Sequence, residues 1–397
     1  MLNKNHTTMK TLVLFLLTLF SISVSGQTIW VADNNFNAPT GTNVFSTIQA
    51  AVNAAAPGDI IQVQPSPNTY GNVTIDKQNL TLMGIGFNVD KDIPLTSIVG
   101  NITLTNTPDN TSDADGTRII GLQFNILYLA PNTGPAFTLE NILVQSCQLT
   151  SYINSLGDYS PTDGLEVRDC YFASTFLSIQ TFLPLDNVVI RNNLFLGRIE
   201  FLSTTAGSNI ITNNILYDGI YIVAEGTATI ISNNNFMGAS GTETAFNTKL
   251  KDCLVSNNIF YGSTPSISTG GTTSSAFERN AFTNNLVHST GDDTMPPTGG
   301  GVGNSGSGNI IANPDFVDMQ MLNTWSSTYD FTLQGGSPAI NAGTDGTDIG
   351  ITGGSYPITG TNFALKTTAA PVIQILNTST VINPGDDLPV RIKAKSN

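Results

Sequence analysis

A six-residue pattern of apolar and polar positions recurs along the chain. Its first and last positions are apolar, and between Val144 and Phe282 the copies start 23, 23, 21, 20, 24 and 27 residues apart. A period in the low twenties with strand-like units predicts a solenoid in which each repeat forms one coil. The ten copies are LMGIGF (from Leu82), IIGLQF (Ile119), VQSCQL (Val144), VRDCYF (Val167), IRNNLF (Ile190), ITNNIL (Ile211), ISNNNF (Ile231), VSNNIF (Val255), FTNNLV (Phe282) and IANPDF (Ile311).

The two central positions of the pattern predict a bend followed by an inward side chain. The third position holds residue types that tolerate a left-handed backbone, so we place a one-residue bend there between two short strands. An inward polar residue at the fourth position needs hydrogen-bond partners, and identical amides on neighbouring coils, roughly 4.8 Å away, supply them. We therefore predict a structural asparagine ladder rather than a catalytic role for Asn193, Asn214, Asn234, Asn258 and Asn285.

These columns resemble the right-handed parallel β-helix of the pectin-lyase-like superfamily, in which an interior asparagine ladder lies beside a tight turn. Two further stretches agree with this resemblance. FSTIQAAVNAAAPGDIIQVQ, from Phe45, is similar to the family's opening, with capping-box spacing at Ser46 and Gln49. DFTLQGGSPAINAG (from Asp330) resembles the closing segment of many exported bacterial β-helix proteins. The resemblance implies an all-β, single-stranded right-handed parallel β-helix of about ten coils with an N-terminal capping helix.

The ends of the chain predict export and a separate tail. Lys4 and Lys10 precede an apolar run and small residues, which is typical of a signal peptide over residues 1–26. We expect the β-helix over residues 27–355, with a Gly- and Pro-rich mobile insertion at Ser289–Gly308, and a C-terminal β tail or cap over residues 356–397. The later sequence contains no second long apolar run, so we expect a secreted or cell-surface protein without a transmembrane segment once the signal is removed.

Composition narrows the choice of partner. The formal net charge is −14, with only 15 Lys and Arg residues, and 11% of the residues are charged, against about 25% in typical domains. Nucleic-acid binding needs clustered cations, so we exclude it. A polysaccharide or a cell-surface protein is the expected partner.

The resemblance directs attention to the catalytic residues of polysaccharide-acting relatives. In PSPNTYGNVTI, Asn72 stands where the pectin methylesterase motif has a glutamate, and the paired aspartates of that family are missing. Of the polygalacturonase signature, only Arg391-Ile392-Lys393 matches, and it lies in the tail. Both activities are therefore disfavoured.

A lyase would need a cation to neutralise a uronate carboxylate and a basic residue to take a proton. Arg168 and Arg191 share an outward column on adjacent coils, Arg198 follows as a candidate substrate-binding residue, and Asp163 and Asp169 could ligate Ca²⁺. The alternative, which we favour, is that Glu166 and Asp169 form surface ion pairs with the arginines.

The outward face after the bend is unusually apolar and carries Tyr171, Tyr217 and Tyr261. Three interpretations stay open at this point. An insertion or the tail covers this face, a protein partner docks on it, or the tyrosines bind substrate by stacking on sugar rings.

Cys147 and Cys170 occupy the inward fourth column on adjacent coils. We expect these two cysteines and Cys253 to be small buried side chains, with a strained disulfide between Cys147 and Cys170 as the alternative.

Two functions follow from these observations. We favour a non-enzymatic extracellular protein that binds a glycan or a surface partner along its elongated face, because no catalytic set is complete. The alternative is a polysaccharide lyase-like enzyme that acts on a uronate-containing polysaccharide at Arg168 and Arg191, with Ca²⁺ as its possible cofactor.

Overall fold

The computed structural model describes residues 26–36, 38–87, 95–106, 113–129, 138–155, 162–181, 185–201, 208–222, 229–239, 243–246, 250–265, 277–297, 302–320, 324–358, 372–378 and 390–395. The signal peptide predicted for residues 1–26 lies outside these residues, except for Gly26. In this described part, no helix combines the length and the apolar character that crossing a bilayer requires.

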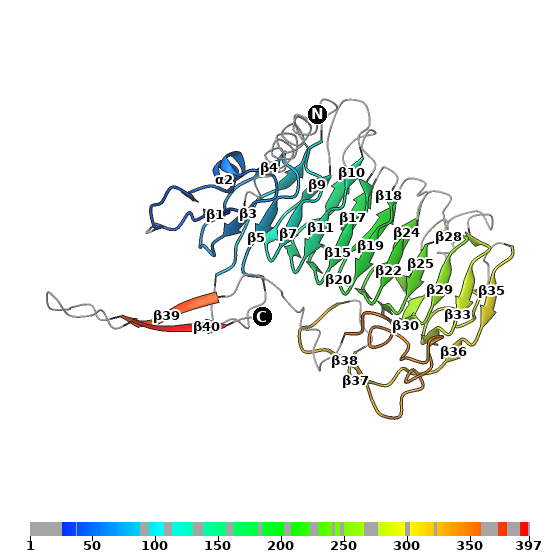
Figure 1. Ribbon diagram of the computed structural model, residues 1–397. Helices are drawn as coiled ribbons and strands as arrows, with labels where there is room; N and C mark the ends of the chain where they lie inside the picture. Colours follow the sequence, from blue (N-terminus) through cyan, green and yellow to red (C-terminus); the bar gives the residue numbers. More distant parts are fainter. Residues whose placement is uncertain are drawn as a thin grey trace, which may run out of the picture.

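Three long parallel sheets form the walls of the molecule, which confirms the predicted parallel β-helix (Figure 1). Coils in the middle of the stack contribute a strand to each of the three sheets in turn, whereas coils at its two ends lack a described strand in sheet 2 or sheet 3. We number these sheets 1, 2 and 3. In the described residues, sheet 1 has 13 strands: β2 (Val44–Phe45), β1 (Ile29–Ala32), β3 (Ile60–Val63), β5 (Thr81–Met83), β7 (Arg118–Ile120), β11 (Leu143–Gln145), β15 (Glu166–Arg168), β19 (Val189–Arg191), β22 (Ile210–Thr212), β25 (Ile230–Ser232), β29 (Leu254–Ser256), β33 (Ala281–Thr283) and β35 (Ser305–Ser307).

Sheets 2 and 3 follow sheet 1 around each coil. Sheet 2 has nine described strands: β8 (Gln123–Phe124), β12 (Gln148–Leu149), β16 (Tyr171–Phe172), β20 (Leu194–Phe195), β23 (Ile215–Leu216), β26 (Asn235–Met237), β30 (Ile259–Tyr261), β34 (Leu286–His288) and β36 (Ile310–Ile311). Sheet 3 has seven: β4 (Val73–Ile75), β6 (Ile102–Leu104), β9 (Leu127–Leu129), β13 (Ile153–Ser155), β17 (Leu177–Thr181), β21 (Arg198–Phe201) and β24 (Ile220–Ile222).

Short strands complete the described structure. Parallel pairings link β10 (Leu139–Glu140), β14 (Thr162–Asp163) and β18 (Leu185–Asp186), then β27 (Glu243–Thr244) with β31 (Ser263–Thr264), and β28 (Leu250–Lys251) with β32 (Phe277–Glu278). Two pairings are antiparallel: β37 (Phe316–Asp318) with β38 (Asp330–Leu333), and β39 (Val372–Thr378) with β40 (Val390–Lys395). The second pair lies within the segment that the sequence predicts to be a β tail or cap, residues 356–397.

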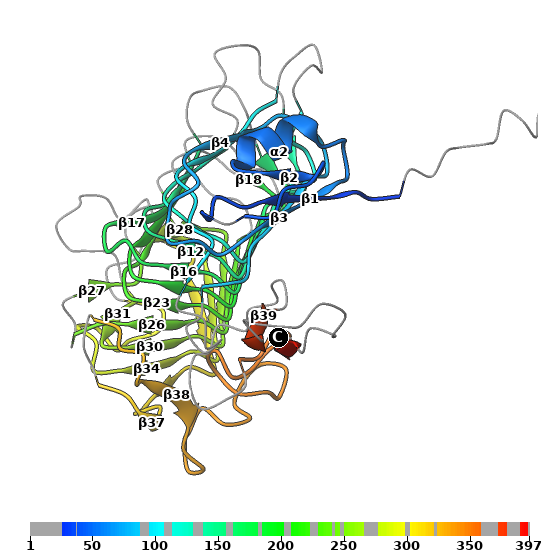
Figure 2. The same ribbon diagram turned by 90° about the vertical axis from the view of Figure 1, so that its left-hand side faces the viewer.

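The helix α2 (Ile48–Ala54) lies at the N-terminal end of the coil stack (Figures 1 and 2). It buries Ile48, Ala51 and Val52 and packs against the first strands, as expected of a cap over bare strand ends. Its N-cap is Thr47, whose hydroxyl accepts from the Ala50 N–H at 3.1 Å, and not Ser46 as the capping-box spacing predicts. Gln49 instead bonds the backbone of Thr74 across the coil, so the predicted box is not formed.

The predicted bend lies at the corner between sheets 1 and 2. Gly121 and the non-glycine bend residues all have φ between 50° and 66°, in the left-handed region: Ser146, Asp169, Asn192, Asn213, Asn233, Asn257 and Asn284. The first and last positions of the pattern are buried, for example Ile231 and Phe236 at 0% exposure, except for the half-buried Phe87 of the first window and Ile311 of the tenth, which is 65% exposed. Inside the coil, Phe236 stacks on Phe260 with ring centroids 4.9 Å apart. Two of the ten windows depart from the pattern, because neither Gly84 nor Asn313 has a positive φ.

The asparagines after the bend face the coil interior and bond one another from coil to coil. The Asn234 Oδ1 accepts from both the backbone N–H and the Nδ2 of Asn214, at 2.9 and 3.0 Å. The Asn234 Nδ2 donates to the Ile211 carbonyl and to the Asn258 Oδ1. The same bonds repeat through the ladder, whose five asparagines are all at 0% exposure: Asn193, Asn214, Asn234, Asn258 and Asn285.

The ladder continues at both ends in a way that the sequence windows miss. Its last member is Asn309, whose Oδ1 accepts from Asn285 at 3.0 Å. Since Gly306 pairs with Phe282, the last six-residue window starts at Gly306 and not at Ile311. Part of the segment predicted as a mobile insertion, Ser305–Ser307, is therefore the last strand of sheet 1. At the other end the Asn193 Oδ1 accepts from the Cys170 N–H at 2.9 Å. Cys147, Cys170 and Cys253 are all buried and free, so the disulfide alternative is not formed.

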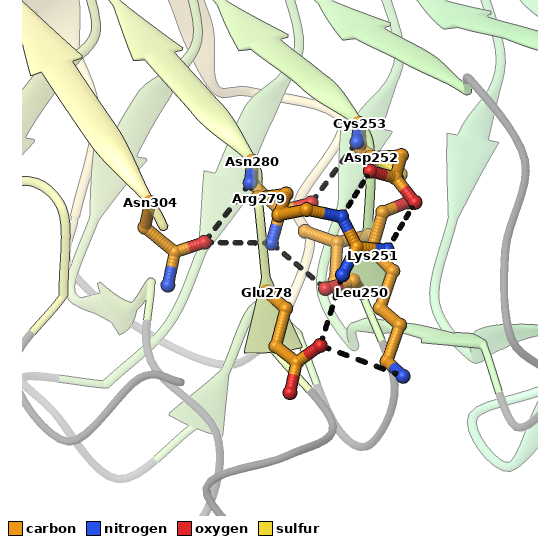
Figure 3. Close-up of polar contacts among 8 residues, drawn as sticks. All are labelled: Leu250, Lys251, Asp252, Cys253, Glu278, Arg279, Asn280 and Asn304. Carbon is orange, nitrogen blue, oxygen red and sulfur yellow. Dashed lines mark hydrogen bonds and ion pairs between the residues drawn. The ribbon is translucent and has the colours of Figure 1, made fainter. Parts of the chain in front are cut away.

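A second corner, where the chain enters sheet 1, repeats the same device. Among the described residues, left-handed residues occur there on nine coils: Gly58, Asn79, Gly116, Asn141, Gly164, Asn187, Asp252, Arg279 and Gly303. The next residue again points inward, and Asn280 donates to the Leu250 carbonyl at 2.7 Å and to the Asn304 Oδ1 at 3.1 Å (Figure 3). Outside the corner, Arg279 holds Asp252 through two bonds of 2.7 Å. A second, shorter amide ladder is thus present that the repeat windows do not cover.

We predict that Asn234→Ala destabilises the protein by about 2–4 kcal/mol, because it leaves the buried Asn214 backbone N–H without its acceptor and removes the amide bonds to the Ile211 carbonyl and the Asn258 Oδ1. The matched control is Ser232→Ala on the outer face of the same coil, which should change stability by less than about 0.5 kcal/mol. Denaturant unfolding followed by circular dichroism measures both. Equal effects of the two substitutions would show that the ladder contributes nothing beyond ordinary packing.

Candidate functional site

The outer face of sheet 2 is covered by a C-terminal segment. We call residues 324–358, which include β38, the strap. They lie beside the later coils of the stack, next to β30 and β36 (Figure 1). Apolar side chains of sheet 2 and of the adjoining Tyr217, of β37 and of the strap form one buried cluster: Leu194, Ile215, Tyr217, Met237, Ile259, Leu286, Phe316, Tyr329, Phe331, Ala339, Ile349 and Ile351. The chain itself covers this face, but the covering residues are neither an insertion nor the tail predicted over residues 356–397, because almost all of the strap precedes that tail.

The bend asparagines hold the strap by its backbone. Their side chains point outward from the corner, and the Asn213 Nδ2 donates to the carbonyls of Ile351 and Gly353 at 3.1 and 2.8 Å. The strap runs antiparallel to the coil order, so later bend residues meet earlier strap residues. The other contacts are Asn192 to Tyr356, Asn233 to Asp348 and Gly350, Asn257 to Thr344, and Asn284 to Ala342.

The strap and the residues near it limit the access of a ligand to Tyr171, Tyr217 and Tyr261. Tyr217 is 3% exposed beneath the strap, so a sugar ring has no access to it. Tyr171 packs against Trp325 at 5.3 Å between ring centroids, and Tyr261 against Phe316 at 5.4 Å. Burial raises the pKa of all three phenols, which keeps them protonated. An open tyrosine stripe is therefore not formed, and substrate contact by the half-buried Tyr171 and Tyr261 stays a prediction.

Arg168 and Arg191 are in register on β15 and β19, as predicted, and share one carboxylate. Arg191 donates to the Glu166 Oε1 at 2.8 and 3.1 Å, and the Arg168 Nε lies 3.5 Å from the same oxygen. The Arg191 guanidinium also lies 4.5 Å from the centre of the Tyr356 ring. Both arginines thus contact Glu166, one of the two carboxylates named in the ion-pair interpretation.

The two predicted calcium ligands stand at opposite ends of β15. Asp163 precedes the strand and accepts from the Asn187 Nδ2 at 2.8 Å, whereas Asp169 follows it at the bend. Among the described residues, no group of three or more His, Cys, Asp or Glu side chains is placed to hold a metal ion. The assignment of Ca²⁺ to this pair stays a prediction.

Sheet 3 carries a different constellation on its outer face. Strand register aligns one outward residue from each of seven successive strands: Thr74, Thr103, Tyr128, Asn154, Gln180, Glu200 and Tyr221. The inward neighbours, such as Ile153, Ile199 and Ile220, are buried in the coil. The alternation of inward apolar and outward polar residues therefore presents a polar and aromatic row, which we call the sheet 3 stripe.

Arg198 and Phe176 join the stripe at its centre. The Arg198 guanidinium lies 4.5 Å from the centre of the Phe176 ring and 5.0 Å from that of Tyr221. Phe176 is 67% exposed, an unusual position for a ring of this size. Gly197 permits this arrangement, since a Cβ there would lie 2.7 Å from the Leu177 nitrogen and the Ser174 carbonyl oxygen.

Glu200 lies beside Arg198 but is not tightly paired with it. The Glu200 Oε2 accepts from the Gln180 Nε2 at 3.0 Å, whereas the Arg198 Nε is 3.6 Å away and makes no hydrogen bond. The side chains of Glu200 and Arg198 are 13% and 21% exposed. Arg198, predicted as a substrate-binding residue, thus lies in a half-buried polar and aromatic cluster apart from Arg168 and Arg191.

Asn154 is the most unusual member of the stripe. It is 4% exposed, and its Oδ1 has no hydrogen-bond partner. A buried acceptor without a donor costs roughly 1–3 kcal/mol, so such groups are rare in folded proteins. Its register places it between Tyr128 and Gln180. The sequence signal for the stripe was the alternation in Arg198–Phe201 and Ile220–Ile222, which the six-residue window does not include.

A cluster of carboxylates lies elsewhere, near the N-terminal coils. The Asp115 Oδ1 accepts from the Glu140 N–H at 2.7 Å, and the Asp113 Oδ1 from the Asp115 N–H at 2.9 Å. Burial, together with the neighbouring charges of Asp113 and Glu140, raises the pKa of Asp115 to about 6. These contacts bend the loop and do not form a site by themselves.

Comparisons with known proteins give only weak likenesses. The sequence matches no protein-family model, and no curated protein resembles it in sequence. Among solved structures, pectate lyase Pel9A aligns at 15% identity over 82% of this chain and 96% of its own, with a TM-score of 0.35. A mannuronic acid specific polysaccharide family 6 lyase from human gut microbiota aligns at 13% identity over 66% of this chain and 73% of its own, with a TM-score of 0.27. Likenesses this weak carry no argument about the chemistry of this chain.

We predict that Asn213→Gly loosens the strap without disturbing the bend, because glycine keeps the left-handed backbone and removes the amide. Asn213→Ala should destabilise the protein by about 1 kcal/mol more, since alanine is strained at this φ. Hydrogen exchange of residues 349–353 measures strap protection, and denaturant unfolding measures stability. The control is Asn141→Gly, a bend residue at the second corner, which should leave strap exchange unchanged. Unchanged exchange in Asn213→Gly would contradict a role for the amide in holding the strap.

We predict that Asp115→Asn stabilises the protein at pH 7.5, because Asn keeps an acceptor for the Glu140 N–H and removes the charge. The folded pKa of Asp115, about 6, lies above its ordinary value of 3.8, so its contribution to stability is full below pH 4 and is lost as the pH rises through 6. The gain in the variant should be on the order of 1 kcal/mol at pH 7.5, allowing for partial solvation, and should disappear near pH 4. Unfolding curves across this range test it, with Asp345→Asn as control. Hydrogen bonds from Thr347 lower the pKa of Asp345, so its substitution should bring no gain at pH 7.5.

Proposed function

We propose that this chain is an exported β-helix protein that binds a polysaccharide along the sheet 3 stripe and does not cleave it. The observation that carries the proposal is the row of outward polar and aromatic side chains on successive strands, with the exposed Phe176 ring beside it. An aromatic ring offers an apolar face to a sugar ring, while amides and carboxylates bond its hydroxyls.

The shape of the stripe suits an extended polymer. Successive strands lie about 4.8 Å apart, so the four steps from Tyr128 to Tyr221 span roughly 19 Å. Each strand contributes a side chain to the same line, and a linear chain of sugars can contact several of them together. The export signal predicted from Lys4, Lys10 and the apolar run after them supports a place outside the cell.

The state of the arginines favours binding over catalysis. Proton abstraction requires a side chain that is free to face the substrate proton at hydrogen-bond distance. Arg168 and Arg191 share Glu166, and Arg198 lies beside Glu200. These cations are therefore suited to hold aromatic rings and carboxylates in place. The lyase hypothesis remains the alternative that the following experiment also tests.

The test is affinity electrophoresis of the purified protein in gels that contain plant, algal or microbial polysaccharides, followed by calorimetry on those that retard it. We expect Phe176→Ala to weaken binding about tenfold, which corresponds to the loss of one ring contact worth about 1.4 kcal/mol. Because the ring is exposed, the melting temperature should not change.

The chain offers a matched control in Tyr356, an exposed ring that lies against Arg191 as Phe176 lies against Arg198. Tyr356→Ala should leave binding unchanged. Loss of binding in Tyr356→Ala alone would move the site to Arg168 and Arg191. Ultraviolet absorbance of unsaturated products, recorded in the same samples with added Ca²⁺, would overturn the non-enzymatic proposal if it rose with time and was lost in Arg168→Ala.

A further inference from the structure

A pocket on the outer face of sheet 1 forms a second candidate site, independent of the sheet 3 stripe. It has a volume of about 450 Å³ and lies on β3, β5 and β7, which are neighbours in sheet 1 at the end of the stack that carries α2 (Figure 1). Sites for small molecules occupy roughly 300–1,000 Å³. We call it the sheet 1 pocket, and the residues that line it are Gln27, Gly58, Ile60, Asn79, Thr81, Met83, Gly116, Arg118 and Ile120.

The floor of the sheet 1 pocket is apolar. Strand register places Met83 beside Ile120 in one outward column, and Ile60 beside Thr81 in the next. Ile60 and Met83 are half-buried and Ile120 is almost fully buried, so the pocket exposes only part of each side chain. Aliphatic and thioether groups form no strong hydrogen bonds, so the floor fits the apolar part of a ligand.

Arg118 is the charged group of the pocket, and its guanidinium is available to a ligand. It is exposed, and within the part of the chain that the structure describes its side chain makes no ion pair and no hydrogen bond. The other described cations outside the tail are engaged, since Lys77 donates to three backbone carbonyls and the rest contact carboxylates. The rest are Arg168, Arg191, Arg198, Lys251 and Arg279. An unpaired guanidinium offers a planar fork of N–H donors that matches a carboxylate.

Two amides stand at the rim of the pocket together with Arg118. Asn79 and Gln27 are both exposed. The Gln27 Nε2 donates to the Gly58 carbonyl at 2.7 Å, which fixes this side chain at the edge. The Asn79 amide lies over Gly116, where a Cβ would overlap with its Oδ1. Glycine at position 116 therefore leaves space for this amide, which can donate a bond to a ligand in the pocket.

We propose that the sheet 1 pocket binds a small monocarboxylate with an apolar body, of the size of phenylacetate. Arg118 binds the carboxylate through two parallel N–H···O bonds, Asn79 donates to the same group, and the apolar body lies on the floor formed by Met83 and Ile120. A sugar acid fits less well, because its hydroxyl groups would lose their hydrogen bonds to water against this floor.

The charge of the whole chain favours a ligand with one negative charge over a ligand with several. The formal net charge is −14, so the protein repels anions at a distance. Salt at 0.1 M screens this repulsion beyond roughly 10 Å, whereas the contact with Arg118 is local. A single carboxylate therefore gains the contact at the smallest cost in repulsion.

The test is a titration of the purified protein, followed by ligand-detected NMR, with four probes: phenylacetate, phenylacetamide, acetate and galacturonate. Phenylacetamide has the same body without the charge, and acetate has the charge without the body. Galacturonate has the charge on a hydroxylated ring. We expect phenylacetate to bind about tenfold or more tightly than each of the other three, because each of them lacks one of the two kinds of contact.

Two variants test the residues. Arg118→Gln should weaken phenylacetate binding about tenfold and leave phenylacetamide binding unchanged. Its melting temperature should not change, because the side chain is exposed. Met83→Gln keeps the length of the side chain and places an amide on the floor, so it should weaken phenylacetate binding about fivefold and leave acetate binding unchanged. The control is Arg279→Gln, an exposed arginine on a later coil outside the pocket, which should leave all four affinities unchanged.

Four results would overturn the proposal. The first is no binding of phenylacetate below about 10 mM. The second is equal affinity for phenylacetate and phenylacetamide, which would remove the role of Arg118, and the third is tighter binding of galacturonate than of phenylacetate, which would contradict the apolar floor. The fourth is an equal loss in Arg118→Gln and Arg279→Gln, which would show that only the total charge of the protein matters. None of these results bears on polysaccharide binding at the sheet 3 stripe, which Phe176→Ala tests.

Discussion

The left-handed residue at the corner between sheets 1 and 2 is the constraint on which the rest of the structure depends. A residue with φ near 55° turns the chain sharply, and it sends the following side chain into the coil and its own side chain outward. Asparagine is one of the few non-glycine residues that accept this backbone at low cost. Its amide then bonds the strap, while the next asparagine bonds the ladder. The sequence therefore has two asparagines in a row because the first points outward to the strap and the second points inward to the ladder.

Much of this organisation could be predicted from the sequence, because it repeats. The inward positions, the bend column and the capping helix all follow from residue types that recur at a nearly constant spacing. The second corner could also have been found, since Asn79, Gly116 and Asn141 are typical left-handed residues. The last coil could not be aligned, because its strand is Ser-Gly-Ser and carries no apolar marker. The apolar pattern therefore assigns Pro314 to the inward fourth position of the last window, whereas the structure has Asn309 there.

The candidate site was harder to predict for a physical reason. Sheet 3 follows connections whose lengths differ from coil to coil, so its strands are not at a fixed distance from the bend. Register between strands, which only the structure gives, aligns Asn154, Gln180 and Glu200 although they are separated by 26 and 20 residues. Burial matters equally. The sequence predicts that Arg168 and Arg191 are neighbours. It does not predict that Glu166 bonds Arg191 or that the Tyr356 ring lies against it.

The strap has a consequence for how this protein can change in length. Its residues from Ala342 to Tyr356 match five successive corners, one after another, from Asn284 back to Asn192. Solenoids ordinarily gain or lose whole repeats with little penalty, because each repeat contacts only its neighbours. Here the strap acts as a ruler, since an added coil between these corners would put every later corner out of step with it. The number of coils is thus fixed in the C-terminal half, whereas coils before Asn192 are free of this restriction.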